Sequence, residues 1–168
     1  MPTTSTRLLG TAQRPNNPPM IRLEPVTAKN YETAMALSPA PDQVNFVAPV
    51  VRSLADAYAY ADQGARALVA MDDETLVGFV LLYPDEWKSE PVMNLVRLLV
   101  DQEYQGRGLG KAILNAAIEE ARNADPRPAK MKLSVVPENA RAIHVYESFG
   151  FAGTEMEDGE RVMLLPLA

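Results

Sequence analysis

Three glycines within five positions, placed between an apolar segment and a helical pattern, constrain the fold more than any other feature of the chain. The stretch reads VDQEYQGRGLGKAIL over residues 100–114. Before it, residues 95–100 form a short apolar run of the kind found in strands buried on both faces. After it, apolar side chains recur at helical spacing from Leu109 onward. A strand, a glycine-rich loop and a helix are therefore expected in succession.

Two familiar phosphate-binding loops do not match this stretch. A P-loop requires a glycine five residues before its Gly-Lys pair and a Ser or Thr after it, but Gln105 and Ala112 stand there. The dinucleotide fingerprint requires a third glycine where Lys111 or Ile113 stands. What remains is the pattern Q-x-x-G-x-G, which starts at Gln105.

The physical properties of this loop suit a pyrophosphate group. Glycine has no Cβ, so the backbone can approach a ligand closely. The start of a helix presents unpaired N–H groups and a partial positive charge to an anion. The alternative is a glycine-rich turn without a ligand, and we favour the ligand.

Periodicity over the rest of the chain predicts an α/β domain. A hairpin is expected across the turn DDET at residues 72–75, a bulge at Gly78, and a loop over 84–93. We expect strands at 21–25, 65–71, 76–83, 95–100, 130–136 and 161–167, and helices over 27–37, from 53, from 109 and over 139–149.

The length of 168 residues predicts one domain with a sizeable core. Residues 1–19 are rich in Pro, Thr and Asn, and we expect a flexible N-terminal arm there. The domain is then expected over residues 20–168.

Charge and composition exclude several classes of partner. A net charge of -6 and an isoelectric point near 4.8 disfavour nucleic acid and anionic membranes and are compatible with a cationic substrate. The absence of cysteine excludes disulfides, thiolate metal sites and a cysteine nucleophile, and it favours the cytoplasm. No metal site is expected from the lone His144. No apolar run reaches the roughly 18 residues of a membrane span, and no signal peptide is evident.

The glycine loop and a second segment together resemble the GNAT superfamily of N-acetyltransferases. The second segment is LSVVPENARAIHVYESFGF, residues 133–151. The two match the family's Q/R-x-x-G-x-G/A loop after the fourth strand and its strand–Asn–helix–Tyr segment ending in FGF. The layout is similar over 20–168, and the match is residue by residue over about 95–151. One departure is Gln102, where the family commonly has proline.

The resemblance implies a mixed central sheet, with the fourth and fifth strands splayed and flanked by helices, and acetyl-coenzyme A (acetyl-CoA) as the acetyl donor. It implies that the donor is held by the backbone of the fourth strand, by the N–H groups of the glycine loop and by the following helix. In this sequence these positions are Leu98, Leu99 and Val100; Gln105, Gly106, Arg107, Gly108, Leu109, Gly110 and Lys111; and Asn139 and Tyr146.

Within this set, the resemblance implies that Asn139 bonds the pantetheine arm and that Tyr146 lies beside the thioester sulfur. The two residues are seven apart, which is two helical turns, so one ligand arm could touch both. The alternative for Tyr146 is a core aromatic packed beside Phe149.

The chemistry of amide formation then suggests roles for these groups. A neutral amine attacks the thioester, an N–H at the end of the splayed strand stabilises the oxyanion, and Tyr146 protonates the leaving thiolate as general acid. Without cysteine, direct transfer in a ternary complex is favoured. Many family members carry a carboxylate base on the fourth strand, but residues 94–99 contain none, so the base is unassigned.

The acceptor is expected to be a primary amine. The C-terminal segment resembles small-amine and polyamine acetyltransferases, whereas a protein N-terminus or lysine is the competing acceptor. A non-catalytic acetyl-CoA-binding module and a homodimer stay open. Carboxylates in two segments are expected to line an acceptor mouth that attracts a polycation, although Arg97 would oppose this. They are Asp85, Glu86, Glu90, Glu155, Glu157, Asp158 and Glu160.

Overall fold

The computed structural model describes residues 18–168. The predicted N-terminal arm, residues 1–19, lies outside the described residues except at its last two positions. The strands are β1 (Ile21–Pro25), β2 (Arg66–Asp72), β3 (Thr75–Trp87), β4 (Glu90–Val100), β5 (Lys130–Val135), β6 (Ala152–Glu157) and β7 (Glu160–Pro166). The helices are α1 (Tyr31–Met35), α2 (Val50–Ala59), α3 (Leu109–Arg122) and α4 (Ala140–Ser148), with short 3-10 turns at Pro41–Gln43, Ala61–Gln63 and Gln102–Tyr104.

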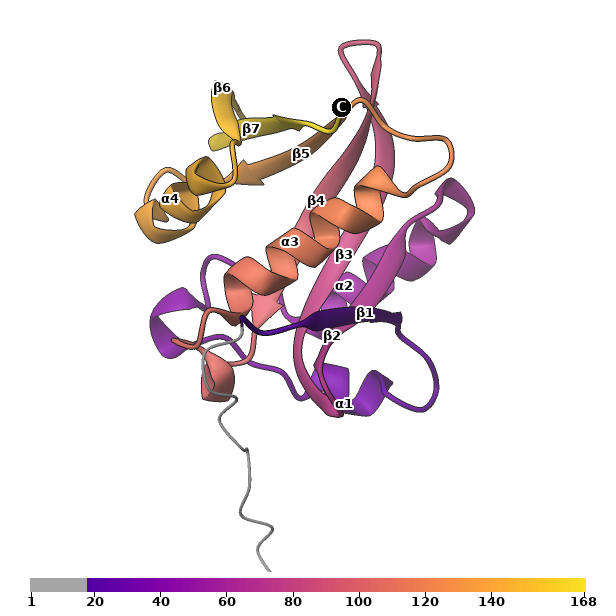
Figure 1. Cartoon of the computed structure of the whole chain (residues 1–168), viewed down its shortest axis with the longest axis vertical. Helices are drawn as coiled ribbons and strands as arrows, with labels where there is room; N and C mark the ends of the chain where they lie inside the picture. The colour runs from indigo at the N-terminus through magenta and orange to yellow at the C-terminus, as the bar shows by residue number, and fades with distance from the viewer. Residues whose placement is uncertain (1–17) are drawn as a thin grey trace, which may run out of the picture.

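Within the described residues, seven strands form one sheet in the order β1-β2-β3-β4-β5-β7-β6 (Figure 1). All neighbouring strands are antiparallel except β4 and β5, which are parallel. This confirms the predicted α/β class and the mixed central sheet.

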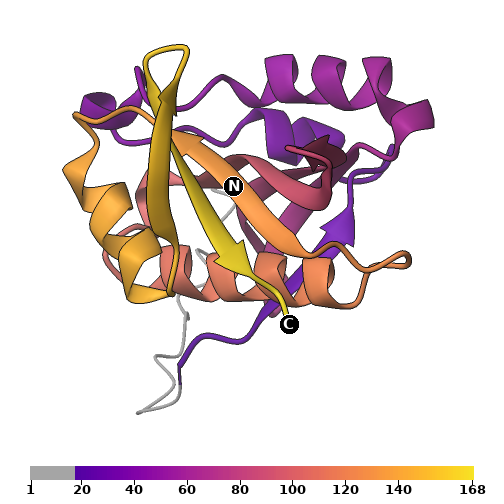
Figure 2. The same cartoon turned by 90° about the horizontal axis from the view of Figure 1, so that it is seen from above.

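Helices cover both faces of the sheet, as the view from above makes plain (Figure 2). Helix α3 lies on one face, where Ile113 and Leu114 are fully buried against strand residues such as Met131. Helices α1 and α2 lie on the other face, over a smaller cluster that includes Phe79 and Leu99. The alternation of apolar side chains along β3 and β4 supplies both clusters.

Gly78 allows α3 to pack closely on the centre of the sheet. A Cβ at this position would lie 2.5 Å from the carbonyl oxygen of Leu99 and 2.7 Å from Cδ1 of Ile113. The expected bulge occurs here as well, because Ala70 pairs with Gly78 while Met71 pairs with Leu76. Glycine is required at this point by the close approach of the neighbouring backbone.

Strands β4 and β5 separate soon after they meet. They pair only over Val92–Asn94 and Lys130–Lys132, although β4 continues to Val100 and β5 to Val135. A bulge at Val96 bends β4 at the start of the separation, since Leu82 pairs with Leu95 while Leu81 pairs with Arg97. The splay of the fourth and fifth strands is therefore present.

The prediction of a loop over residues 84–93 is wrong. Strands β3 and β4 instead continue as a long hairpin that turns at Lys88 and Ser89, both with positive φ. Such two-residue turns usually carry Asn or Gly, which are missing here. Proline has no backbone N–H to donate to a neighbouring strand. Pro84 lies beyond the part of β3 that pairs with β2, and Pro91 lies before the part of β4 that pairs with β5, so both prolines are tolerated.

The starts of the first two helices also differ from the prediction. Thr27 does not cap α1, because its hydroxyl accepts a hydrogen bond from the N–H of Lys29 in a turn that precedes the helix. Ser53 does not start α2 either. That helix begins at Val50, directly after Pro49, and Ser53 is buried inside it.

Candidate active site

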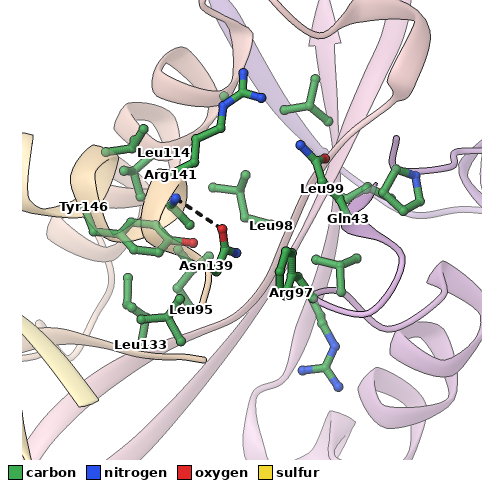
Figure 3. A pocket seen from close by; sticks show the side chains of 18 of the residues that line it. Gln43, Leu95, Arg97, Leu98, Leu99, Leu114, Leu133, Asn139, Arg141 and Tyr146 are labelled. Atoms are coloured by element: carbon green, nitrogen blue, oxygen red, sulfur yellow. Dashed lines mark hydrogen bonds between the residues drawn. The ribbon is translucent and has the colours of Figure 1, made fainter. Parts of the chain in front are cut away.

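A cavity of about 890 Å³ occupies the gap between β4 and β5 (Figure 3). On the α3 side it is lined by the glycine loop, the start of α3 and residues of α4. On the α2 side it is lined by Val96 and Arg97 of β4 and by the whole segment 43–49, which precedes α2. The cavity thus passes through the sheet at the point where the ladder is interrupted, and two ligands could approach each other from opposite faces.

The glycine loop presents bare backbone to this cavity. Gly106 and Gly108 adopt positive φ values of 79° and 76°, and Gly108 is the N-cap of α3. A Cβ at either position would meet nothing within 4 Å, so open space lies beside the backbone. No side chain caps the helix start, which leaves its first N–H groups available to an anion. These features fit a phosphate group of a coenzyme.

Gln105 fixes the loop to its surroundings through its side chain. The Nε2 amide group donates one hydrogen bond to the carbonyl oxygen of Val100 at 3.0 Å and another to Oε1 of Gln43 at 2.9 Å. The first bond closes the turn that follows β4. The second connects the glycine loop with the segment that walls the other half of the cavity.

Asn139 caps α4 and keeps a free donor. Its Oδ1 accepts a hydrogen bond from the N–H of Ala142 at 3.3 Å. The Nδ2 group has no partner among the described residues, and Asn139 lines the cavity. The amide can therefore donate to a carbonyl oxygen of a bound ligand while the cap stays intact.

Tyr146 lies two turns after Asn139, and its hydroxyl points toward the Asn139 side chain (Figure 3). The ring packs edge-on against Phe151 at 5.8 Å between centroids, whereas Phe149 was the expected neighbour. Its hydroxyl has no hydrogen-bond partner among the described residues. Burial raises the pKa of this phenol above its ordinary value of 10.0, so the group keeps its proton at neutral pH.

The side chain of Arg97 is directed away from Tyr146, toward α2 (Figure 3). Its guanidinium group donates to the carbonyl oxygen of Val96 at 2.9 Å and lies 3.7 Å from Oδ2 of Asp56. The Asp56 carboxylate, which also pairs with Arg52 at 3.1 Å, offsets part of the Arg97 charge that would repel a cationic acceptor.

Most of the predicted donor-binding residues are brought together. Those that line the cavity are Leu98, Leu99, Val100, Gln105, Gly106, Gly108, Leu109, Gly110, Lys111, Asn139 and Tyr146. Arg107 does not line it, and its guanidinium carbon lies 5.7 Å from the ring centroid of Tyr104.

Sequence reasoning missed several lining residues. Arg141 and His144 line the cavity from α4, and their closeness to Asn139 on one helix could have indicated this. Ser134 of β5 and the segment 43–49 line it as well. No sequence signal marks that segment, because its position depends on how the chain enters α2.

The predicted acidic mouth is largely absent. Of the seven carboxylates expected there, Glu160 is the one that lines the cavity. Three others form ion pairs elsewhere: Glu90 with Lys130, Glu155 with Lys88 at 2.8 Å, and Glu157 with Lys132 at 3.6 Å. Lysines near the two hairpins therefore neutralise much of the charge on which the expectation was based.

Two further observations concern the described part of the chain. No group of three or more His, Asp or Glu side chains within residues 18–168 is arranged to hold a metal ion. None of the helices in this range combines the length and the apolar character needed to cross a membrane.

Comparison with known proteins gives a consistent set of similarities. The model of the acetyltransferase (GNAT) family matches residues 32–151. The chain is 31% identical over 153 residues to the spermine/spermidine N(1)-acetyltransferase of Bacillus subtilis, covering 88% of this chain and 99% of that protein.

Two solved structures show the same fold. One is the spermidine N-acetyltransferase of Vibrio cholerae in complex with CoA and spermine, with a TM-score of 0.66, 18% identity and coverage of 86% of this chain and 93% of that one. The other is an aminoglycoside acetyltransferase in complex with coenzyme A, with a TM-score of 0.68, 22% identity and coverage of 87% and 94%.

Proposed function

The chain belongs to the acetyltransferase (GNAT) family and is an N-acetyltransferase that uses acetyl-CoA, and we propose that its acceptor is a polyamine. The B. subtilis relative, which is named for spermine and spermidine, aligns over nearly the whole of both chains. The structural observation that carries the proposal is the cavity through the splayed sheet, where the Tyr146 hydroxyl, without a hydrogen-bond partner among residues 18–168, points toward Asn139 (Figure 3).

We propose that the donor occupies the α3 side of the cavity. The open backbone at Gly106 and Gly108 and the uncapped start of α3 suit a pyrophosphate. Lys111 and Arg141 line the same side and can add positive charge. The free amide of Asn139 suits a carbonyl of the pantetheine arm. When bound there, acetyl-CoA supplies a thioester whose carbonyl carbon a neutral amine can attack.

Tyr146 is proposed as the general acid. Its phenol holds a proton at neutral pH because burial disfavours the phenolate, and no described residue competes for that proton. A proton held beside the gap can pass to the sulfur that leaves as the new amide bond forms. The packing against Phe151 fixes the ring, so the hydroxyl needs little reorganisation.

The amine must lose a proton before it attacks, and the part of β4 that lines the cavity, residues 95–100, carries no carboxylate for this purpose. Residues 94–99 carry Asn94 and Arg97 as their polar side chains, and Arg97 is turned toward Asp56. We therefore propose that the proton leaves through water in the cavity and assign no side chain as the base.

The test is a screen of amine acceptors in which release of free coenzyme A is measured. Spermine and spermidine should give turnover well above that of N-terminal and lysine peptides. Turnover with peptides alone would favour the competing acceptor class. Tight acetyl-CoA binding without turnover on any amine would favour a non-catalytic binding module.

A further inference from the structure

We propose that Glu160 is the acceptor-binding carboxylate of this enzyme and holds an ammonium group of the polyamine on the α2 side of the sheet. This inference rests on the proposed function and names the residue that selects a cationic acceptor. Four features support it: the position of Glu160 in the sheet, its lack of a partner, its contrast with Glu157, and the distribution of charge in the cavity.

The register of the sheet determines the face on which Glu160 lies. In β7, Met163 and Leu165 are buried in the core under α3. Side chains alternate along a strand, so Glu160 belongs to the opposite face. The turn of the β6–β7 hairpin accordingly rises on the side where α2 lies (Figure 2). Glu160 therefore reaches the cavity from the side opposite α3 and the glycine loop.

Glu160 is partly buried as a residue, and its side chain has no ion-pair or hydrogen-bond partner among the described residues. A carboxylate that lines a cavity without a partner can pair with a bound cation, and this attraction is stronger where bulk water is partly excluded.

Glu157 provides an internal comparison. It pairs directly with Glu160 across the hairpin, so both side chains project from the same face of the sheet. Glu157 is exposed, does not line the cavity and lies 3.6 Å from the Nζ of Lys132. Of two neighbouring carboxylates, one is thus neutralised from within the chain and the other faces the cavity.

The charges around the cavity are divided between its two sides. Lys111 and Arg141 lie on the α3 side, and Arg97 on the α2 side is engaged by Asp56. Glu160 is the single carboxylate among the described lining residues. An ammonium group that enters from the α2 side therefore finds its counter-ion at Glu160, while phosphates find theirs on the α3 side.

The expected effect is that of a hydrogen bond to a charged group. Glu160→Gln keeps the size of the side chain and removes its charge, so the affinity for spermine should fall about 10- to 100-fold. Affinity for acetyl-CoA should not change, because the donor is held on the other side. Glu160→Asp keeps the charge and should retain part of the affinity.

The test measures spermine binding to the coenzyme A-loaded protein by calorimetry, for wild type, Glu160→Gln and Glu157→Gln, each first checked for an unchanged melting temperature. Loss of spermine binding in Glu160→Gln alone supports the assignment. Equal binding by all three proteins, or equal losses in both variants, overturns it, as does wild-type protein that binds no spermine. Calorimetry measures binding without turnover, so the two proposals can fail separately. If spermine binding depends on Glu160 but the protein acetylates no amine, the proposed function is wrong and the assignment of Glu160 is retained.

Discussion

The side-chain amide of Gln105 donates a hydrogen bond of 2.9 Å to Oε1 of Gln43, which lies 62 positions earlier in the chain. The same Nε2 group also bonds the carbonyl oxygen of Val100 at 3.0 Å. One side chain thus joins the end of β4, the glycine loop and the segment that walls the α2 side of the cavity. This contact fixes the position of the glycine loop relative to the segment 43–49.

Gln105→Ala removes both hydrogen bonds and should weaken acetyl-CoA binding by up to about 30-fold, since each bond is worth roughly 1 kcal/mol. Gln43→Ala removes one of them and should cost only a few-fold. Calorimetric titration with acetyl-CoA compares the two variants. Equal affinities for Gln105→Ala and wild type would show that the side chain does not organise the loop.

Two glycine variants should separate the effect on the ligand from the effect on the fold. Gly108→Val places a β-branched residue at a φ of 76° and should destabilise the protein by on the order of 1–3 kcal/mol. Gly110→Ala adds a Cβ at an ordinary 3.6 Å from Val100 and should stabilise it by up to about 1 kcal/mol.

Both glycine variants should nevertheless lose acetyl-CoA affinity, because both add a side chain where the pyrophosphate is proposed to lie. Thermal unfolding and calorimetry measure the two effects separately. If both variants fold and bind acetyl-CoA as tightly as wild type, this loop does not bind the pyrophosphate.

Tyr146→Phe should lower kcat by about 100-fold or more while KM changes little, because a positioned proton donor is lost. The wild-type kcat should also fall at alkaline pH, above the ordinary phenol value of 10.0, because burial raises the pKa of Tyr146. The variant should lack this alkaline limb. Steady-state rates across pH measure both effects. A Tyr146→Phe variant with full kcat would show that Tyr146 is a packing residue and not the general acid.

The raised pKa of Tyr146 also determines how the stability of the folded protein changes with pH. The folded state favours the neutral phenol, so the contribution of Tyr146 is complete below pH 10.0 and is lost as the pH rises through the raised pKa. Chemical denaturation at increasing pH should therefore show a steeper alkaline loss for wild type than for Tyr146→Phe. Parallel curves for the two proteins would contradict the burial of the hydroxyl.

The KM for spermine should rise with ionic strength while kcat changes little, because salt screens attraction over a Debye length of about 8 Å under physiological conditions. Ion pairs of Glu90, Glu155 and Glu157 leave less free charge than the sequence suggests, so the slope should be shallower than seven carboxylates would give. Kinetics at several salt concentrations test this. A KM that ignores salt would favour a neutral amine or a peptide.

Features governed by local chemistry were predictable from the sequence. β1 spans the residues that alternation indicates, and α4 lies within the helix expected over 139–149. The glycine loop likewise lies where its pattern indicates, between β4 and α3. In each case the signal and the structure involve the same few residues.

Features that depend on distant partners were not predictable in the same way. The β3–β4 hairpin turns at Lys88 and Ser89, which carry none of the usual turn residues, so residues 84–93 suggested a loop. The pairing of Glu157 with Lys132 and the free side chain of Glu160 depend on the register of three strands. The role of Tyr146 stays a prediction, because geometry shows its position and not its chemistry.

The most direct measurement is mass spectrometry of spermine after incubation with acetyl-CoA and the purified protein. We expect spermine to gain the mass of one acetyl group, in an amount equal to the coenzyme A released, and Tyr146→Phe to form this product far more slowly. Unmodified spermine alongside tightly bound acetyl-CoA would contradict the assignment of this protein as a polyamine N-acetyltransferase.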